Sequence, residues 1–315
     1  MYRRAIELYK HDGKWQEALV YLHVGVQHRR SKQDTIILEK LMTLMIDVCA
    51  ENLSTAYLKE DIGYFRNLCQ HQSMNLLEKV LTYLRTKSEK EFERLERDVA
   101  EDQLRRFLSD DQPVGEEKQV EFEQAIGSPD ELIHLAYTQM ETLEQKNKIL
   151  PRSSFYLDIC KNILDTLRSN AKLLEFYNET VRRVFAFCKK YNAKREFRRI
   201  SETLHNHFNQ IVKHDKMLEG QPVQAYSKIP HPIRLDNEQT VTQLLKIRKE
   251  QLVLALHLEE WSDAQHTANN IYALMRKYSR GKSEQDMLQL QADFYEQLAY
   301  IFWQSKLYLF HTYAL

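Results

Sequence analysis

The sequence predicts an all-α protein built from helical repeats, and two features of its composition lead to this prediction. Only 7 glycines and 6 prolines interrupt the 315 residues, so few positions favour turns. Leu, Glu, Lys, Arg and Gln, which all favour helices, fill much of the remainder. The chain is long enough to bury a substantial core without a metal or disulfide. We therefore expect long helices with few turns.

The first 109 residues are predicted to form N-terminal helical repeats, in which apolar residues recur at the three-four spacing of one helix face. We expect helices over residues 2–10, 58–70 and 74–107, with two more between the first two of these. The last of these helices becomes highly charged from about residue 85, since 21 of the 39 residues from 85 to 123 are charged. This composition favours a solvated helix that projects from the repeats.

An acidic flexible loop over residues 110–127 is expected next, because Pro113 and Gly115 lie among acidic residues. The run Ser128-Pro129-Asp130-Glu131 then has the features of a helix start, with Ser as the cap and Pro at the first helical position. It opens a block of central helical repeats, 128–219. We expect Pro151 to end the first helix of this block, because proline removes a backbone donor.

The central repeats contain the most regular apolar pattern of the chain, on two helices that are expected to bury one another. The first carries Leu174, Tyr177, Val181, Val184, Phe185 and Cys188, and the second carries Phe197, Ile200, Leu204, Phe208 and Ile211. A Pro-rich connection over residues 220–236 is expected to follow and to mark an internal boundary. A last helical block, 237–315, completes the chain.

Two helix starts resemble each other, which indicates repetition. Lys14-Trp15-Gln16-Glu17-Ala18 opens the second helix, and Glu260-Trp261-Ser262-Asp263-Ala264 opens a helix of the last block. In helix-turn-helix arrays, an aromatic residue at a helix start and an Ala three residues later allow two helices to pack closely. The expected fold is a TPR/HEAT-like superhelical array.

No sequence motif predicts catalysis or a cofactor. The sequence contains no Walker loop, no GxGxxG, no HExxH, no GxSxG and no paired-cysteine zinc spacing. His205 and His207 lie two residues apart, so on a helix they point in different directions and cannot chelate one metal without distortion. We expect no enzyme activity, no cofactor and no metal.

The cysteines and the apolar runs bear on the cellular compartment. Cys49, Cys69, Cys160 and Cys188 form no CxxC pair, as expected for reduced, buried thiols. Charged residues interrupt every apolar run well before the roughly 20 residues that a bilayer requires. We therefore expect a cytoplasmic protein that makes no membrane contact.

One segment has an unusual charge. Residues 182–216 carry ten Lys or Arg against three acidic residues, in a chain with 45 of each sign. Exposed Arg and Lys bind phosphates and carboxylates, so this segment is a candidate contact for nucleic acid or an acidic protein. The alternative is a solvated face with ordinary pairs along the helix, such as Arg198 with Glu202. The candidate contact residues are Arg182, Arg183, Lys189, Lys190, Lys194, Arg195, Arg198 and Arg199, with Arg29, Arg30 and Lys32 of an earlier basic turn as secondary candidates.

Several runs of residues resemble one known family in order and spacing. They include Leu167-Arg168-Ser169-Asn170, Phe185-Ala186-Phe187-Cys188, Lys194-Arg195-Glu196-Phe197-Arg198-Arg199-Ile200 and Phe302-Trp303-Gln304-Ser305. Together they resemble the a subunit of eukaryotic translation initiation factor three. The resemblance covers most of the chain outside residues 85–148 and 220–232.

This resemblance implies a helical-repeat arm that leads into a PCI-type module, which is absent or only begun here. It implies a non-catalytic scaffold subunit that helps the initiation factor to recruit mRNA and to bind the small (40S) ribosomal subunit. The implied partners are other subunits of the factor, especially the c subunit, together with proteins of the small ribosomal subunit, with rRNA or mRNA as further candidates. The basic residues named above would then contact the ribosome or RNA.

Two alternatives remain open on the sequence. The same architecture occurs in PCI-type scaffold subunits of the proteasome lid or signalosome, which would bind only sister subunits. A stand-alone helical repeat that grips short peptides in a concave groove is the second alternative.

Overall fold

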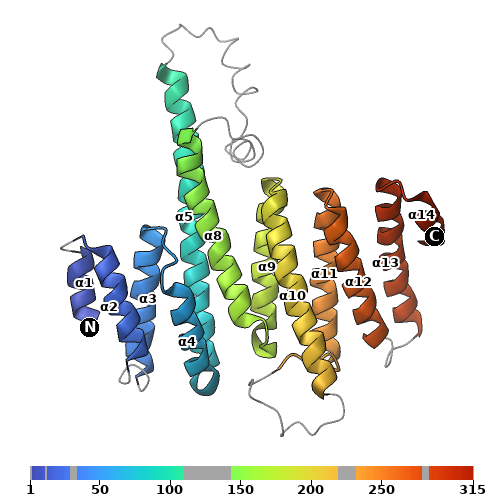
Figure 1. Ribbon diagram of the computed structural model, residues 1–315, viewed down its shortest axis with the longest axis horizontal. Helices are drawn as coiled ribbons and strands as arrows, with labels where there is room; N and C mark the ends of the chain where they lie inside the picture. The colour runs from blue at the N-terminus through green and yellow to red at the C-terminus, as the bar shows by residue number, and fades with distance from the viewer. Residues whose placement is uncertain are drawn as a thin grey trace. The chain divides into compact units, whose positions relative to one another are not determined.

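A computed structural model describes the chain as a series of helices (Figure 1). The described residues are 2–10, 13–28, 34–109, 143–218, 232–278 and 284–314. Within these ranges there is no β-strand, and extended pairing is limited to an isolated bridge between Asn170 and Pro232. The prediction of an all-α helical-repeat protein is therefore confirmed.

The chain divides into two compact units, Met1–Thr166 and Leu167–Leu315. The division falls where α8 ends and a short 3-10 helix begins, a position at which the sequence shows no Pro-rich or Gly-rich break. The predicted connection over 220–236 lies mostly outside the described residues. It belongs to the second unit, between α10 and α11.

Unit 1 is built from consecutive helices that pack on their neighbours. It contains α1 (Tyr2–Lys10), α2 (Trp15–Gln27), α3 (Thr35–Glu51), α4 (Leu58–Gln72), α5 (Met74–Ser109) and most of α8 (Leu143–Leu167). Helix α1 packs on α2, α2 on α3 and α4, and α5 on α3 and α4. Gly13 has φ +65, a backbone conformation that glycine adopts without strain, and it closes the connection between α1 and α2.

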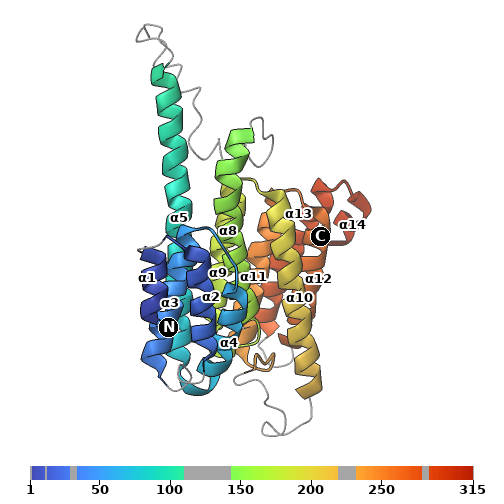
Figure 2. The ribbon, with the colours of Figure 1, turned by 60° about the vertical axis from the view of Figure 1, so that its left-hand side comes forward.

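The 36-residue helix α5 extends beyond α3 and α4 in both views (Figures 1 and 2). Its charged part is nevertheless packed for some distance past residue 85. Arg85, Ser88, Glu91 and Phe92 are all buried, and the Phe92 ring stacks on Tyr156 of α8 with centroids 5.7 Å apart. Packing against α8 therefore covers a stretch for which the sequence alone suggests solvent.

Unit 2 has two alternating layers of helices. It contains η1 (Ala171–Leu173), α9 (Leu174–Lys190), α10 (Lys194–Leu218), α11 (Glu238–His257), α12 (Trp261–Tyr278), α13 (Glu284–Gln304) and α14 (Tyr308–Ala314). Helix α9 packs on both α10 and α11, and α12 packs on both α10 and α11. Because α9 also neighbours α11, and α10 neighbours α12, successive helix pairs stack as in a helical repeat.

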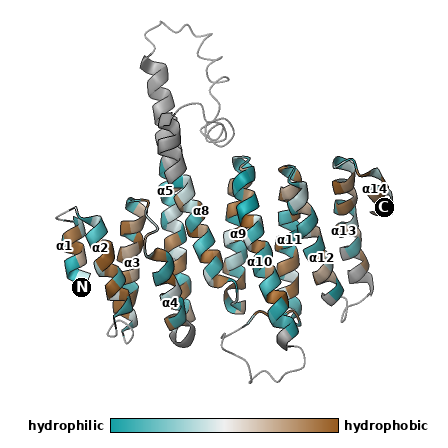
Figure 3. Cartoon of the chain, viewed as in Figure 1, coloured by the Kyte–Doolittle hydropathy of each residue, from teal (hydrophilic) through white to brown (hydrophobic). Residues whose placement is uncertain are grey.

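The apolar faces predicted for α9 and α10 form the core of unit 2. Every member of the two stripes is buried, from Leu174 to Cys188 and from Phe197 to Ile211. Along each helix, hydrophobic and hydrophilic residues alternate as expected for elements buried on one side (Figure 3).

One predicted helix boundary is wrong. Helix α8 runs through Pro151 to Leu167, although proline was expected to end a helix there. Proline removes only one backbone donor, and the residues after it, including Phe155, Tyr156 and Ile159, bury apolar side chains. That packing outweighs the lost hydrogen bond. The predicted helix start at Ser128 and the acidic loop over 110–127 lie outside the described residues.

Candidate functional site

A tight turn brings the predicted basic residues of α9 and α10 to one end of a helical hairpin. Asn192 adopts φ 47, a left-handed conformation that Asn tolerates better than most residues. The Ala193 N–H donates to the Cys188 carbonyl at 3.0 Å, and Tyr191 is buried beneath the turn. The last residues of α9 and the first of α10 therefore share one edge of unit 2, which we call the α9–α10 turn (residues 189–195).

Most of the candidate cations are paired with glutamates. The pairs are Arg182 with Glu250 (Nε to oxygen, 3.1 and 3.0 Å), Arg183 with Glu179 (2.8 Å), Lys194 with Glu259 (3.4 Å), Arg198 with Glu260 (2.6 Å) and Arg199 with Glu196 (2.9 Å). Three of these glutamates come from α11 or the residues that follow it, so they neutralise the basic stretch from outside. Local sequence charge therefore overstates the field that this face presents.

The predicted pair between Arg198 and Glu202 is wrong. Glu260 lies directly before α12, which packs on α10, and its carboxylate is only 8% exposed. A carboxylate held there attracts the guanidinium more strongly than a solvated one on the same helix. The hydrogen bond and the charge of Glu260 raise the pKa of Arg198 above its usual value.

The remaining cations cluster at the α9–α10 turn. Lys189, Lys190 and Arg195 are exposed, and the Lys190 ammonium lies 5.1 Å from the centroid of the Tyr191 ring. Among the described residues, neither Lys189 nor Arg195 has an ion-pair partner. The secondary candidates Arg29, Arg30 and Lys32 lie outside the described residues.

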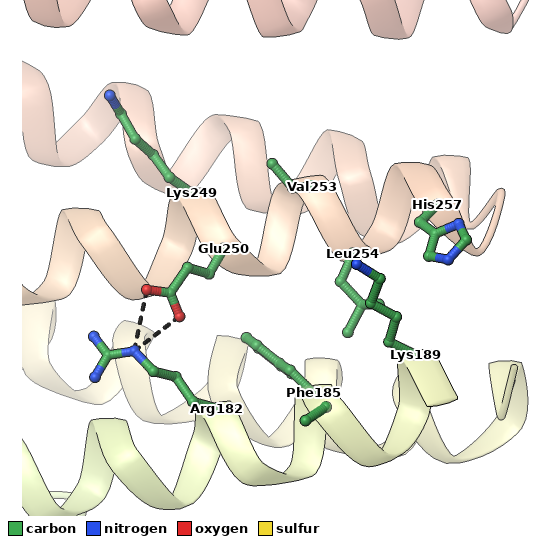
Figure 4. A pocket seen from close by; sticks show the side chains of 9 residues that line it. Arg182, Phe185, Lys189, Lys249, Glu250, Val253, Leu254 and His257 are labelled. Atoms are coloured by element: carbon green, nitrogen blue, oxygen red, sulfur yellow. Dashed lines mark hydrogen bonds and ion pairs between the residues drawn. The ribbon is translucent and has the colours of Figure 1, made fainter. Parts of the chain in front are cut away.

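A groove separates the exposed edges of α9 and α11 (Figure 4). It is open to solvent and has a volume of about 730 Å³. Helix α9 contributes Arg182, Phe185, Ala186 and Lys189, and α11 contributes Lys249, Glu250, Val253, Leu254 and His257. Two of the predicted contact residues, one at each end of the α9 wall, thus line a concave surface that the sequence did not reveal.

A buried polar network that sequence reasoning missed joins α10 and α11. Arg248 of α11 donates to the Gln251 side-chain oxygen at 2.6 Å and to the Leu204 carbonyl at 2.7 Å. Gln251 in turn donates to Ser201 at 2.9 Å. Burial lowers the pKa of Arg248 to about 10. The signal in the sequence was an arginine four residues from both Leu244 and Leu252, on the apolar face of its helix.

The two histidines of α10 have different neighbours. The Nδ1 atom of His207 lies 3.0 Å from the Tyr177 hydroxyl, in the interior. His205 instead lies 3.1 Å from the Asn270 side-chain nitrogen, and burial lowers its pKa. In the part of the chain that the structure describes, no group of three or more His, Cys, Asp or Glu side chains is arranged to hold a metal ion.

The four cysteines are buried, as predicted, and none of them is part of a disulfide in the described residues. Burial, together with the charge of Asp61, raises the pKa of Cys49 to about 12, and burial alone raises that of Cys69 to about 12. Such thiols are poor nucleophiles because little thiolate forms.

None of the helices in the described ranges is long and apolar enough to cross a bilayer.

The described residues therefore define a class: a helical-repeat protein that presents a basic turn and a groove on its second unit. Over residues 1–315, the chain matches the model of the family described as "eIF3a, PCI domain, TPR-like region", and it belongs to that family. This match confirms the resemblance seen in the sequence.

Curated relatives of the chain are named as A subunits of this initiation factor. The chain is 28% identical over 305 residues to the A subunit of eukaryotic translation initiation factor 3 from Aspergillus clavatus, and 29% identical over 315 residues to that from Coccidioides immitis. These alignments cover 96% and 99% of this chain. The chain spans about 27% and 28% of the length of those relatives.

Proposed function

We propose that this chain is the helical-repeat arm of a non-catalytic scaffold subunit of translation initiation factor 3, acting in the cytoplasm. In this proposal it helps the factor to recruit mRNA and to bind the small (40S) ribosomal subunit. The family match over the whole chain supports the assignment to this factor, and it favours this factor over the proteasome lid or signalosome. The proposed partners are other subunits, especially the c subunit, together with small-subunit ribosomal proteins and rRNA or mRNA.

The observation that carries the ribosome contact is the exposure of basic residues at the α9–α10 turn. A cation whose charge is neutralised by a glutamate attracts phosphate less strongly than one without such a partner. At this turn Arg195 is exposed and has no ion-pair partner among the described residues, and Lys190 beside it is also exposed. We therefore place the proposed contact at the turn and not along all of residues 182–216.

The test is a double charge reversal, Lys190→Glu with Arg195→Glu, in the complete factor. We expect weaker co-sedimentation with small ribosomal subunits. The slope of log affinity against log salt should flatten by about 2, since roughly one counterion is released for each phosphate contact. Arg198 is left intact because its reversal would set a carboxylate against Glu260 and disturb the packing of α10 on α12.

The matched control is Lys213→Glu with Lys216→Glu. Both lysines are exposed on α10, about five turns from Arg195 at ~3.6 residues per turn, and the double variant changes the charge by the same amount. Equal loss of binding in both variants would show a general effect of charge. Unchanged binding of the turn variant at every salt concentration would remove the proposed contact.

A further inference from the structure

The α9–α11 groove combines an apolar floor with a positively charged rim. Phe185 and Leu254 close the floor and are each 6% exposed. Above them Ala186 is exposed, and Val253 exposes 52% of its surface on the opposite wall. A small side chain facing an exposed β-branched one leaves room for an apolar group from another molecule, and burying that group would remove apolar surface from water.

The rim carries three cationic side chains and a single carboxylate. Arg182 uses its Nε to bind both oxygens of Glu250, and its terminal amino groups point away from that carboxylate (Figure 4). Lys189, at the other end of α9, is exposed and has no carboxylate partner within the described ranges. Lys249 pairs outward with Asp293 of α13 at 3.3 Å. The groove therefore favours a ligand with negative charge.

The dimensions of the groove limit the form of that ligand. Arg182 and Lys189 are seven residues apart on α9, or about 10 Å at ~1.5 Å per residue. An extended chain advances about 3.3 Å per residue, so three to four residues span this distance. Helices α9 and α11 pack directly on each other, and a third helix about 10 Å wide would rest above the groove without filling it.

The same features disfavour a nucleic acid in the groove. Single strands bind where successive bases stack on several exposed aromatic rings. In the groove Phe185 is almost fully buried, which leaves the imidazole of His257 as the exposed ring of the lining. The Glu250 carboxylate also lies between the cations along the groove (Figure 4), where it would repel a continuous phosphate backbone. A peptide can avoid this carboxylate because its acidic side chains need not be evenly spaced.

We propose that the α9–α11 groove binds an extended acidic peptide segment of a partner protein. One apolar side chain of the peptide lies between Ala186 and Val253. Acidic side chains on either side of it pair with Lys189 and with the terminal amino groups of Arg182. This site is separate from the contact proposed for Lys190 and Arg195, since it uses the concave surface between α9 and α11.

The test is an array of five-residue peptides with a varied central residue, probed with the purified 315-residue chain. The flanks are acidic (Glu-Asp-X-Asp-Glu) or are the matching amides (Gln-Asn-X-Asn-Gln). We expect binding of acidic peptides with Leu, Ile, Phe or Met at the centre, and weaker binding of those with Ser. No preference for acidic over amide flanks would overturn the proposal.

Two variants locate the binding. Lys189→Glu removes a rim cation and Val253→Glu places a carboxylate in the apolar part, and each should weaken the best acidic peptide about tenfold, as expected for one charge-assisted contact. Both residues are exposed, so the helices should persist by circular dichroism. The controls are Lys213→Glu on α10 and Val20→Glu on α2, where Val20 is 45% exposed.

The outcomes separate this proposal from the ribosome contact. Peptide binding that is lost in Lys189→Glu and Val253→Glu but kept in the Lys190 and Arg195 variant supports the groove alone. Peptide binding that survives both groove variants places the peptide elsewhere and contradicts the inference. If the groove variants weaken binding of a six-nucleotide uridine RNA while no acidic peptide binds, the ligand is a nucleic acid and the inference is wrong.

Discussion

Each unit of this protein buries a charged side chain, and the two are accommodated differently. In unit 1, Asp61 of α4 is fully buried and lies 2.9 Å from the Nδ1 of His23 on α2, a titratable partner. In unit 2, Arg248 is 4% exposed and donates to two uncharged oxygens, those of Gln251 and Leu204. Its guanidinium also lies 5.2 Å from the centroid of the Phe208 ring.

The difference determines how each of these two buried positions responds to pH. Burial raises the pKa of Asp61 to about 6, although the charge of His23 and its hydrogen bond act in the opposite direction. This carboxyl group changes its charge near neutral pH. Burial lowers the pKa of Arg248 only to about 10, so the guanidinium stays charged at neutral pH. Asp61 is thus a titrating interior position, whereas Arg248 links α10 and α11 and keeps its charge at neutral pH.

The largest effect is expected from Arg248→Ala. It removes both hydrogen bonds of the guanidinium, leaves the buried Gln251 oxygen without its donor and opens a cavity beside Phe208. Together these losses should cost about 4 kcal/mol of unfolding free energy. Amide hydrogen exchange in α10 and α11 measures the loss where it occurs. Arg248→Met is the control, because an apolar side chain of similar length restores packing and should recover part of the stability. A cost below about 1 kcal/mol for the alanine variant would show that the network contributes little.

A pH-dependent effect is expected from Asp61→Asn. The folded pKa is raised, so the folded state binds this proton more tightly than the unfolded state does. The contribution of the group to stability is therefore greatest below about pH 4 and falls as the pH rises to about 6. The total fall should approach 3 kcal/mol, at about 1.4 kcal/mol for each of roughly two pKa units.

Asparagine cannot ionise, so the variant should lose this fall. Its stability relative to the natural chain should rise between pH 4 and 6 and then level off, as measured by thermal unfolding at a series of pH values. Parallel curves for the two proteins would mean that Asp61 does not titrate in this range. Arg248→Met should leave the pH dependence of the natural chain unchanged over the same interval.

The smallest effect is expected from Tyr83→Phe in unit 1. The Tyr83 hydroxyl donates to Asp47 at 2.6 Å, but Asp47 also binds the Lys87 ammonium at 2.7 Å and keeps this partner in the variant. Loss of one partly exposed hydrogen bond should cost about 1 kcal/mol, detected as a small shift of the denaturant midpoint. A cost as large as that of Arg248→Ala would remove the distinction between buried and partly exposed polar contacts.

Features that depend on residues close in sequence were predicted well. The three-four spacing of apolar residues identified the buried faces of α9 and α10, because side chains three or four positions apart always share a helix face. The positions of α1, α12 and α13 follow from the same local pattern and from helix-start residues. The family, too, was recognisable from short runs of residues in the right order.

Features that depend on contacts between distant segments could not be predicted. Glu260, the partner of Arg198, lies 62 positions further along the chain, and nothing in the pattern around Arg198 specifies how α10 packs on α12. Pro151 did not end α8, because the burial of residues after it outweighs a single lost hydrogen bond. The α9–α11 groove and the exposed charges of the α9–α10 turn could not be predicted for the same reason. The helix period determines which side chains share a face, but packing between helices decides which faces meet, which charges are neutralised and which remain exposed to a partner.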